Sequence, residues 1–144
     1  MRWIPVALMA VHGLIHLVGF AKGFGYAAFP QLTQPISRPL GLAWLAAALL
    51  VTTSAALLGA GARSYWIPGA LGLLMSQAVI FSAWGDAWAA TAANVLLLLI
   101  VAHGWLTEGP RSFHAQYLRD ARVGLVRVVA EPLSGLPPNS GAEM

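Results

Sequence analysis

The sequence predicts an all-α integral membrane protein, a bundle of four transmembrane helices, and three observations lead to this fold class. First, 58% of the 144 residues are hydrophobic and 9% are charged, whereas typical soluble domains carry about 25% charged residues. Second, four apolar stretches are each long enough to cross a bilayer, and third, tryptophans mark their ends. This composition, with a mean hydropathy of +0.71, excludes an ordinary soluble enzyme and a disordered chain. The lack of cysteine in the sequence excludes a disulfide scaffold.

Each of the four apolar stretches is expected to form a helix. A transmembrane helix needs about 20 mostly apolar residues to cross roughly 30 Å of hydrocarbon. The stretches are rich in Ala, Leu and Gly and lack the alternation of strands, and an α-helix satisfies its own backbone in lipid. The expected helices cover residues 3–22, 40–59, 65–84 and 88–106.

Proline and glycine separate the expected helices. Pro30, Pro35 and Pro39 interrupt the first connection, which therefore cannot be a continuous helix. The remaining breaks are Gly59 with Gly61, Gly85 with Asp86, and Gly109 with Pro110.

Positive charges predict which side of the membrane each end of the bundle faces. Six arginines flank one side, and Lys22 and Arg38 flank the other. Because cytoplasmic loops carry an excess of Lys and Arg, we expect a multi-pass membrane protein with both termini in the cytoplasm. The six arginines are Arg2, Arg63, Arg111, Arg119, Arg122 and Arg127. The tryptophans of the expected interfacial belt are Trp3, Trp44, Trp66, Trp84, Trp88 and Trp105.

The amino-terminal segment also has features of a secretory signal peptide, because Arg2 precedes an apolar run. Two histidines and a lysine interrupt that run, and no clear small-residue cleavage site follows at the right distance. We therefore expect the first helix to be retained.

Residues 110–131 are expected to form a basic amphipathic helix at the cytoplasmic membrane surface. Phe113, Tyr117 and Leu125 lie on one helical stripe, and most charged residues lie off it. The alternative is a helix that packs on a partner or on a further soluble domain. Residues 132–144 are rich in Pro, Gly and Ser and are expected to be disordered.

Few polar side chains fall inside the expected helices, so each is a candidate for function. His12 and His16 are one turn apart and share a helix face that continues through Gly19 and Gly23. A rise of about 1.5 Å per residue places His16, Gln77 and Asn94 at similar depths. The predicted intramembrane polar cluster contains His12, His16, Ser76, Gln77 and Asn94, with Thr91 and Ser82 nearer its outer mouth and His103 apart on the opposite face.

The histidine pair has several interpretations. The structural one is a pair of neutral side chains that hydrogen-bond to Gln77, Asn94 or Ser76 and hold the helices together. In the second, His12 and His16 bind one metal ion, since two imidazoles one turn apart can share a ligand. The sequence offers no third strong ligand, and two histidines on one face cannot clamp a haem from both sides. No cofactor is therefore predicted, and haem, a metal, a proton or a small ligand are alternatives.

Three charged residues are expected at the outer mouth of the bundle: Lys22, Arg38 and Asp86. The simpler interpretation is that they solvate the loops and snorkel to the surface. The sharper one is that Asp86 pairs with Lys22 or Arg38 and closes the outer end.

The sequence shows no catalytic constellation: it has no Ser–His–carboxylate set, no acidic pair and no glycine-rich phosphate loop after a strand. A pI near 10.0 is compatible with nucleic acid, but the arginines are explained by the positive-inside pattern. The expected partner is the lipid bilayer, with no nucleic acid.

Two motifs resemble a known group. HGLIHLVGFAKGFG and the later PISRPLGLAWL are similar to the HGxIHxxGFxKxF and PISRPxGxxWL motifs of uncharacterised bacterial membrane proteins. The resemblance covers roughly the first 105 residues and implies a four-helix inner-membrane protein, with no known activity. Longer members continue into a soluble domain of unknown function. The positions marked by the motifs are His12, Gly13, His16, Gly19, Lys22, Ser37, Arg38, Pro39 and Trp44.

Three functions are compatible with these features. The favoured one is a non-enzymatic bundle that self-associates as a homo-oligomer or serves as an accessory subunit of a larger membrane complex, because alanines such as Ala47 and Ala55 allow close helix approach. The alternative is a binding or transport module for a small molecule, quinone, haem or metal at His12 and His16. A membrane enzyme with a histidine acid or base is the least favoured.

Overall fold

The computed structural model describes residues 2–130, with side chains as far as Gly124, and this part of the chain is helical without any strand. Residues 132–144, for which disorder is predicted, lie outside it. The elements in chain order are α1 (Trp3–Gly23), α2 (Arg38–Gly59), the 3-10 turn η1 (Arg63–Tyr65), α3 (Trp66–Ser82), α4 (Trp84–Ala87), α5 (Ala90–Glu108) and α6 (Phe113–Ala130).

Four of these helical segments are long and apolar enough to cross a membrane, as the sequence predicts. Only 22% to 39% of the most apolar window of each is buried inside the chain. Large apolar side chains such as Leu74 and Leu106 are about 70% exposed. An apolar surface of this extent requires an apolar solvent or partner, because in water it would aggregate.

The expected boundaries of the helices hold to within a few residues, for local reasons. The Ser37 hydroxyl accepts a hydrogen bond from the Leu40 N–H at 3.4 Å and caps α2, and Pro39 lies in its first turn. Gly61 follows the end of α2 and has a φ of +75°, a left-handed backbone conformation that favours glycine. The main difference is α4, a single turn that separates α3 from α5.

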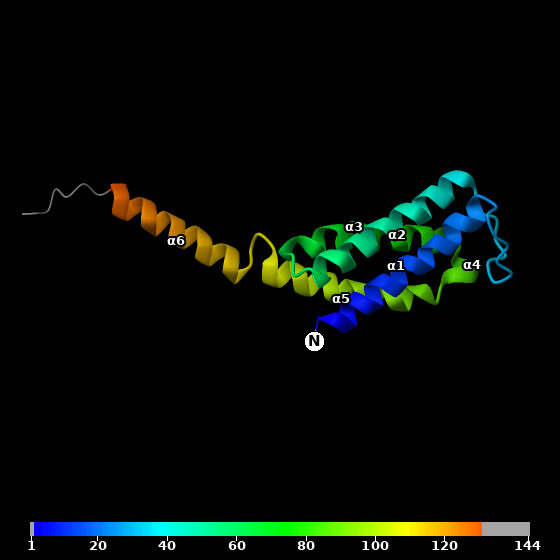
Figure 1. Ribbon diagram of the computed structural model, residues 1–144, viewed down its shortest axis with the longest axis horizontal. Helices are drawn as coiled ribbons and strands as arrows, with labels where there is room; N and C mark the ends of the chain where they lie inside the picture. Colours follow the sequence, from blue (N-terminus) through cyan, green and yellow to red (C-terminus); the bar gives the residue numbers. More distant parts are fainter. Residues whose placement is uncertain (1, 131–144) are drawn as a thin grey trace, which may run out of the picture.

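The long helices pack in chain order. α1 lies along α2, α2 along α3 and α3 along α5, whereas α1 and α5 touch at only a few positions (Figure 1). We call the end that holds Trp3, η1 and Glu108 the amino end, and the end that holds residues 24–37 and α4 the loop end. α1 crosses α5 obliquely between these two ends (Figure 1).

Small residues allow α1 and α2 to approach closely. A Cβ atom added at Gly23 would lie 2.9 Å from Gly41 Cα, and one added at Gly19 would overlap the indole of Trp44. Ala47 and Ala48 of α2 are also buried within the chain. The predicted small-residue face of the first helix therefore packs on the second helix of the same chain.

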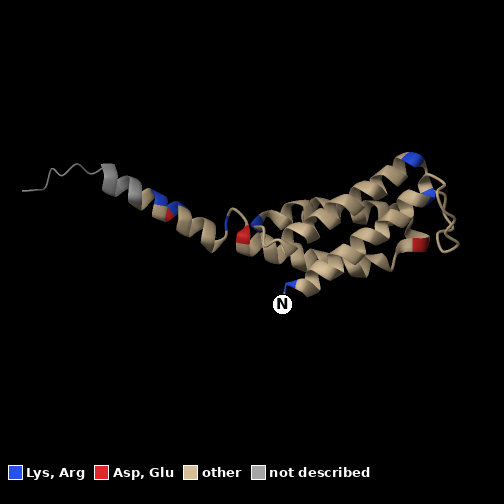
Figure 2. Ribbon diagram, viewed as in Figure 1, with Lys and Arg blue, Asp and Glu red and all other residues tan. Residues whose placement is uncertain are grey.

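Charges are confined to the ends of the four-helix unit (Figure 2). Lys22, Arg38 and Asp86 lie at the loop end, and Arg63 and Glu108 lie at the amino end. α6 leaves the amino end and extends away from the bundle (Figure 1), and its described apolar side chains, including Phe113, are exposed. Its predicted position at the membrane surface stays a prediction.

Candidate functional site

A chain of buried polar side chains joins α1, α3 and α5 near the middle of the bundle. His12 Nε2 lies 2.9 Å from Asn94 Oδ1 and 3.3 Å from Ser76 Oγ. The Ser76 hydroxyl donates to the same Asn94 oxygen at 2.8 Å. All three side chains are at most 6% exposed. These bonds connect three helices through groups that could not otherwise be solvated in lipid.

The polar chain continues from Asn94 toward the surface. Asn94 Nδ2 donates to Gln77 Oε1 at 2.9 Å, and Gln77 Nε2 donates to Thr91 Oγ1 at 3.4 Å. Because the Asn94 carbonyl oxygen can only accept, His12 Nε2 must carry a proton in this arrangement. We refer to His12, Ser76, Asn94, Gln77 and Thr91 as the polar chain.

His16 does not join the polar chain, although the sequence predicts that it meets Gln77 and Asn94. That prediction is wrong because α1 crosses the bundle obliquely, so equal rise along two helices does not give equal depth (Figure 1). His12 reaches Asn94 instead, and the structural interpretation is thus confirmed for His12 alone. Ser82 also stays apart and donates to Val79 O in its own helix.

His16 is 1% exposed and lies between two aromatic rings. Its ring centroid is 4.8 Å from that of His12, edge to face, and 5.3 Å from that of Trp44. Within the described residues, neither ring nitrogen of His16 has a hydrogen-bond partner, and neither does Trp44 Nε1. A neutral imidazole offers one donor and one acceptor and an indole offers one donor, so three buried polar functions are unsatisfied.

Trp44 was expected in the interfacial belt, and this prediction is wrong. Trp44 is only 4% exposed and packs against His16 and Gly19 inside the bundle. Trp3 and Trp88, by contrast, are more than 60% exposed near helix ends. The one sequence signal for a buried Trp44 was its place in the PISRPxGxxWL motif, which accompanies the motif of Gly19, the residue whose lack of a side chain accommodates the indole.

His16 and Trp44 line a cavity of about 240 Å³ that lies between α1 and α5 near the loop end. We call it the histidine cavity. His12 lies at its inner limit, and Ala87, Ala89 and Ala90 contribute a wall of small side chains. Gln31, Leu32 and Asp86 line it on the side of the loop.

Lys22 and Asp86 fix the loop that covers the histidine cavity. Lys22 Nζ donates to the carbonyl oxygens of Leu32 and Gln34, the latter at 2.7 Å. Asp86 accepts from the Gln34 N–H at 2.8 Å and from the Thr33 hydroxyl at 2.7 Å. These two bonds, the backbone one first, hold the pKa of the Asp86 carboxyl below its ordinary value.

The direct ion pair considered for Asp86 does not form. In the described part of the chain, Asp86 contacts neither Lys22 nor Arg38 as a salt bridge, and Arg38 is exposed at the start of α2. Lys22 and Asp86 act on the same loop segment from two sides. The outer end is therefore closed by the loop backbone, which is held between the side chains of Lys22 and Asp86.

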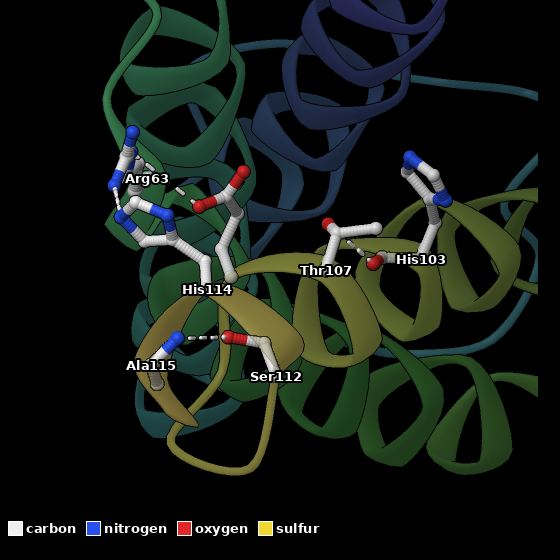
Figure 3. A network of polar contacts seen from close by, with 7 residues as sticks. Arg63, His103, Thr107, Ser112, His114 and Ala115 are labelled. Carbon is white, nitrogen blue, oxygen red and sulfur yellow. Dashed lines mark hydrogen bonds and ion pairs between the residues drawn. The ribbon is translucent and has the colours of Figure 1, made fainter. Parts of the chain in front are cut away.

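A second group of polar contacts lies at the amino end (Figure 3). Arg63 Nε is 3.5 Å from Glu108 Oε2, and the Arg63 guanidinium also contacts His114 at the start of α6. The Ser112 hydroxyl accepts from the Ala115 N–H at 3.2 Å. His103 lies near this group, is exposed, and is separate from the polar chain, as predicted.

The histidine pair offers few ligands for a metal. Among the described residues, no group of three or more His, Cys, Asp or Glu side chains gathers in one place. His12 Nε2 is already bonded to Asn94 and Ser76. The His16 imidazole and the Trp44 indole keep hydrogen-bonding capacity that no described residue uses.

Comparisons with known proteins do not assign a family or an activity: no family model, curated protein or solved structure matches this chain.

Proposed function

We propose that this chain is a multi-pass protein of the bacterial inner membrane whose amino end faces the cytoplasm, with α6 at the membrane surface there. The exposed apolar faces of the four long helices support insertion. The excess of arginine beside the amino end supports this orientation, because positively charged segments are retained in the cytoplasm. The loop end and the histidine cavity then face the periplasmic side.

Within this topology, the proposed function is to bind an uncharged, lipophilic molecule with a planar head that carries carbonyl oxygens, of the quinone type. One observation carries the proposal: His16 is 1% exposed, has no partner for either ring nitrogen among the described residues, and lines a cavity of about 240 Å³. An unsatisfied buried polar group costs about 1–3 kcal/mol. A carbonyl oxygen that accepts from His16 or Trp44 would recover part of this cost.

The walls of the histidine cavity favour a flat and neutral head. His16 and Trp44 give the cavity lining an aromatic character, and three alanines contribute small side chains to the same lining. The nearest carboxylate, Asp86, already accepts two hydrogen bonds from the loop. A charged ligand would need a buried counter-charge, and such burial without a partner is costly.

Self-association or an accessory role is a separate prediction, with less support from the packing. Five alanines of α2 suggested a contact face, and three of them, Ala47, Ala48 and Ala55, are buried within the chain, whereas Ala46 is partly buried and Ala56 is exposed. Most of this face is thus used within the bundle. By contrast, no contact within the described part of the chain satisfies the buried ring nitrogens of His16, which lines the histidine cavity.

The proposal is tested by titrating a tailless quinone, 2,3-dimethoxy-5-methyl-1,4-benzoquinone, into ¹⁵N-histidine-labelled protein in nanodiscs. We expect a saturable shift of the His16 ring nitrogens, which are identified by their loss in the His16→Leu variant. The His16→Leu variant should lose binding, measured as quinone retained by the nanodiscs in equilibrium dialysis. The matched control is His103→Leu, which removes an exposed histidine at the amino end and should bind as the wild type does.

Two results would refute the proposal. One is a wild-type titration in which the His16 nitrogens do not shift. The other is quinone retention that is equal in the wild type and His16→Leu, since binding would then be partition into lipid.

A further inference from the structure

The histidine cavity is the first of three hollows between α1 and α5. The second, of about 40 Å³, lies in the middle of the bundle and shares His12 with the histidine cavity. The third, of about 370 Å³, lies at the amino end and shares Ile100 with the second. The shared residues show that the three hollows follow one another along the line where α1 and α5 touch at few positions. We call this line the seam.

The chemistry of the seam changes along its length. At its loop end the seam is lined by His16 and Trp44, whose buried ring nitrogens have no hydrogen-bond partner among the described residues. The middle is lined by apolar side chains, among them Leu8, Met9 and Leu96, apart from His12 itself. This hollow has the smallest volume of the three, so it has room for a linear chain of methylene groups and too little for a ring.

We propose that the ligand of the histidine cavity is an amphiphile with a single linear hydrocarbon tail, and that this tail lies in the seam, pointing from His16 toward the amino end. This inference rests on the proposed function, and adds the chemical class of the ligand and its direction. The polar head sits where the hydrogen-bonding groups are, and the tail follows the apolar hollows that continue from it. A head without a tail would leave the middle of the seam to be filled by lipid chains.

The side chain that controls the narrow hollow is Ala93, on α5. It lines the middle hollow and is partly buried, so a larger side chain there would fill the passage. The preceding residue, Ala92, is exposed and lies off the seam. Substitution of Ala92 is therefore a matched control of equal size on the same helix.

The test uses a quinone with a decyl tail that carries a photoreactive diazirine at its end. After illumination in nanodiscs, labelled residues are mapped by peptide mass spectrometry, alongside titration of the tailless quinone. We expect labelling to concentrate on Met9, Leu97 and Ile100 in the wild type, because these side chains line the middle hollow and are buried or partly buried. Ala93→Phe should reduce labelling of Leu97 and Ile100 at least fivefold while the tailless quinone still binds, and Ala92→Phe should change neither.

The outcomes separate this inference from the proposed function. If the tailless quinone binds and depends on His16, but the tail labels lipid-facing residues such as Leu42 and Leu74 as strongly as the seam, the inference is wrong and the proposed function stands. If the tailless quinone does not bind in a His16-dependent way, the proposed function itself fails. Loss of tailless binding in Ala93→Phe would place the head in the middle hollow and also overturn the inference.

Discussion

His12 and His16 are the same residue type on the same face of α1, yet their surroundings give them different tasks. His12 donates to Asn94 and thereby links α1 to α5. His16, one turn on, has aromatic neighbours and no polar partner among the described side chains. The first histidine therefore joins two helices of the bundle, while the hydrogen-bonding capacity of the second is used by no described residue.

This difference predicts opposite effects of the two leucine substitutions on stability. His12→Leu removes the donor to Asn94 and should lower the free energy of unfolding by about 1–2 kcal/mol, near the upper range measured for polar contacts between membrane helices. His16→Leu removes an unsatisfied polar group and should leave the stability equal or higher. Unfolding in mixed micelles with increasing SDS measures both values, and a larger loss for His16→Leu than for His12→Leu would contradict these roles.

At the scale of elements, the loop of residues 24–37 behaves as a cover that is fixed by the helices on either side of it. Lys22 at the end of α1 and Asp86 in α4 bind the same three-residue stretch, at Leu32, Thr33 and Gln34. The cover is thus positioned by hydrogen bonds to its backbone more than by its own sequence.

The loop should loosen when Asp86 is protonated. The carboxylate accepts the Gln34 N–H and the Thr33 hydroxyl, which lowers its folded pKa below the ordinary 3.8. With the folded pKa lowered, the carboxylate stabilises the fold above its unfolded pKa, and this contribution is lost as the pH falls through the folded pKa. The Gln34 amide ¹H shift should follow this titration with a midpoint below 3.8, and Asp86→Asn should abolish the transition. A midpoint at or above 3.8 would show that the contact does not hold in solution.

The elements also show which features the sequence could predict. Apolar length predicts the four long helices, and proline and glycine predict their ends, because these signals act within one helix. The positions of Trp44 and of the covering loop could not be predicted in this way. Both depend on contacts between segments that are distant in the sequence, such as Gly19 against Trp44 and Asp86 against the Gln34 backbone.

Only part of the candidate site could be predicted, because its contacts also depend on how the helices pack. His12, Ser76, Gln77 and Asn94 could be identified because polar residues inside an apolar helix are few. Which of them bond to one another could not be determined, since a tilt of α1 decides whether His12 or His16 meets Asn94. The role of Trp44 was hidden because a tryptophan near a helix end has an ordinary interfacial explanation.

At the scale of the whole molecule, the charged residues of the described four-helix unit lie at its two ends, and none lies between them (Figure 2). This distribution predicts the topology, and because the chain has no cysteine, single cysteines can report it cleanly. In intact cells with a permeable outer membrane, Tyr26→Cys in the loop should react with a membrane-impermeant maleimide. Ala60→Cys, near η1, should react only after the inner membrane is opened. Both positions are exposed in the fold, so the reverse pattern would mean that the bundle is inverted.

The measurement that tests the central claim most directly is mass spectrometry of the organic extract of the protein purified in mild detergent from bacterial membranes. If the histidine cavity holds a neutral, tailed carbonyl compound, the wild type should release such a compound in an amount close to one per chain. His16→Leu, purified in equal yield, should release at least tenfold less, while His114→Leu, which removes an exposed histidine of α6 that lines none of the three hollows, should match the wild type. Equal amounts from the wild type and His16→Leu would contradict the claim that His16 and its cavity form a ligand site.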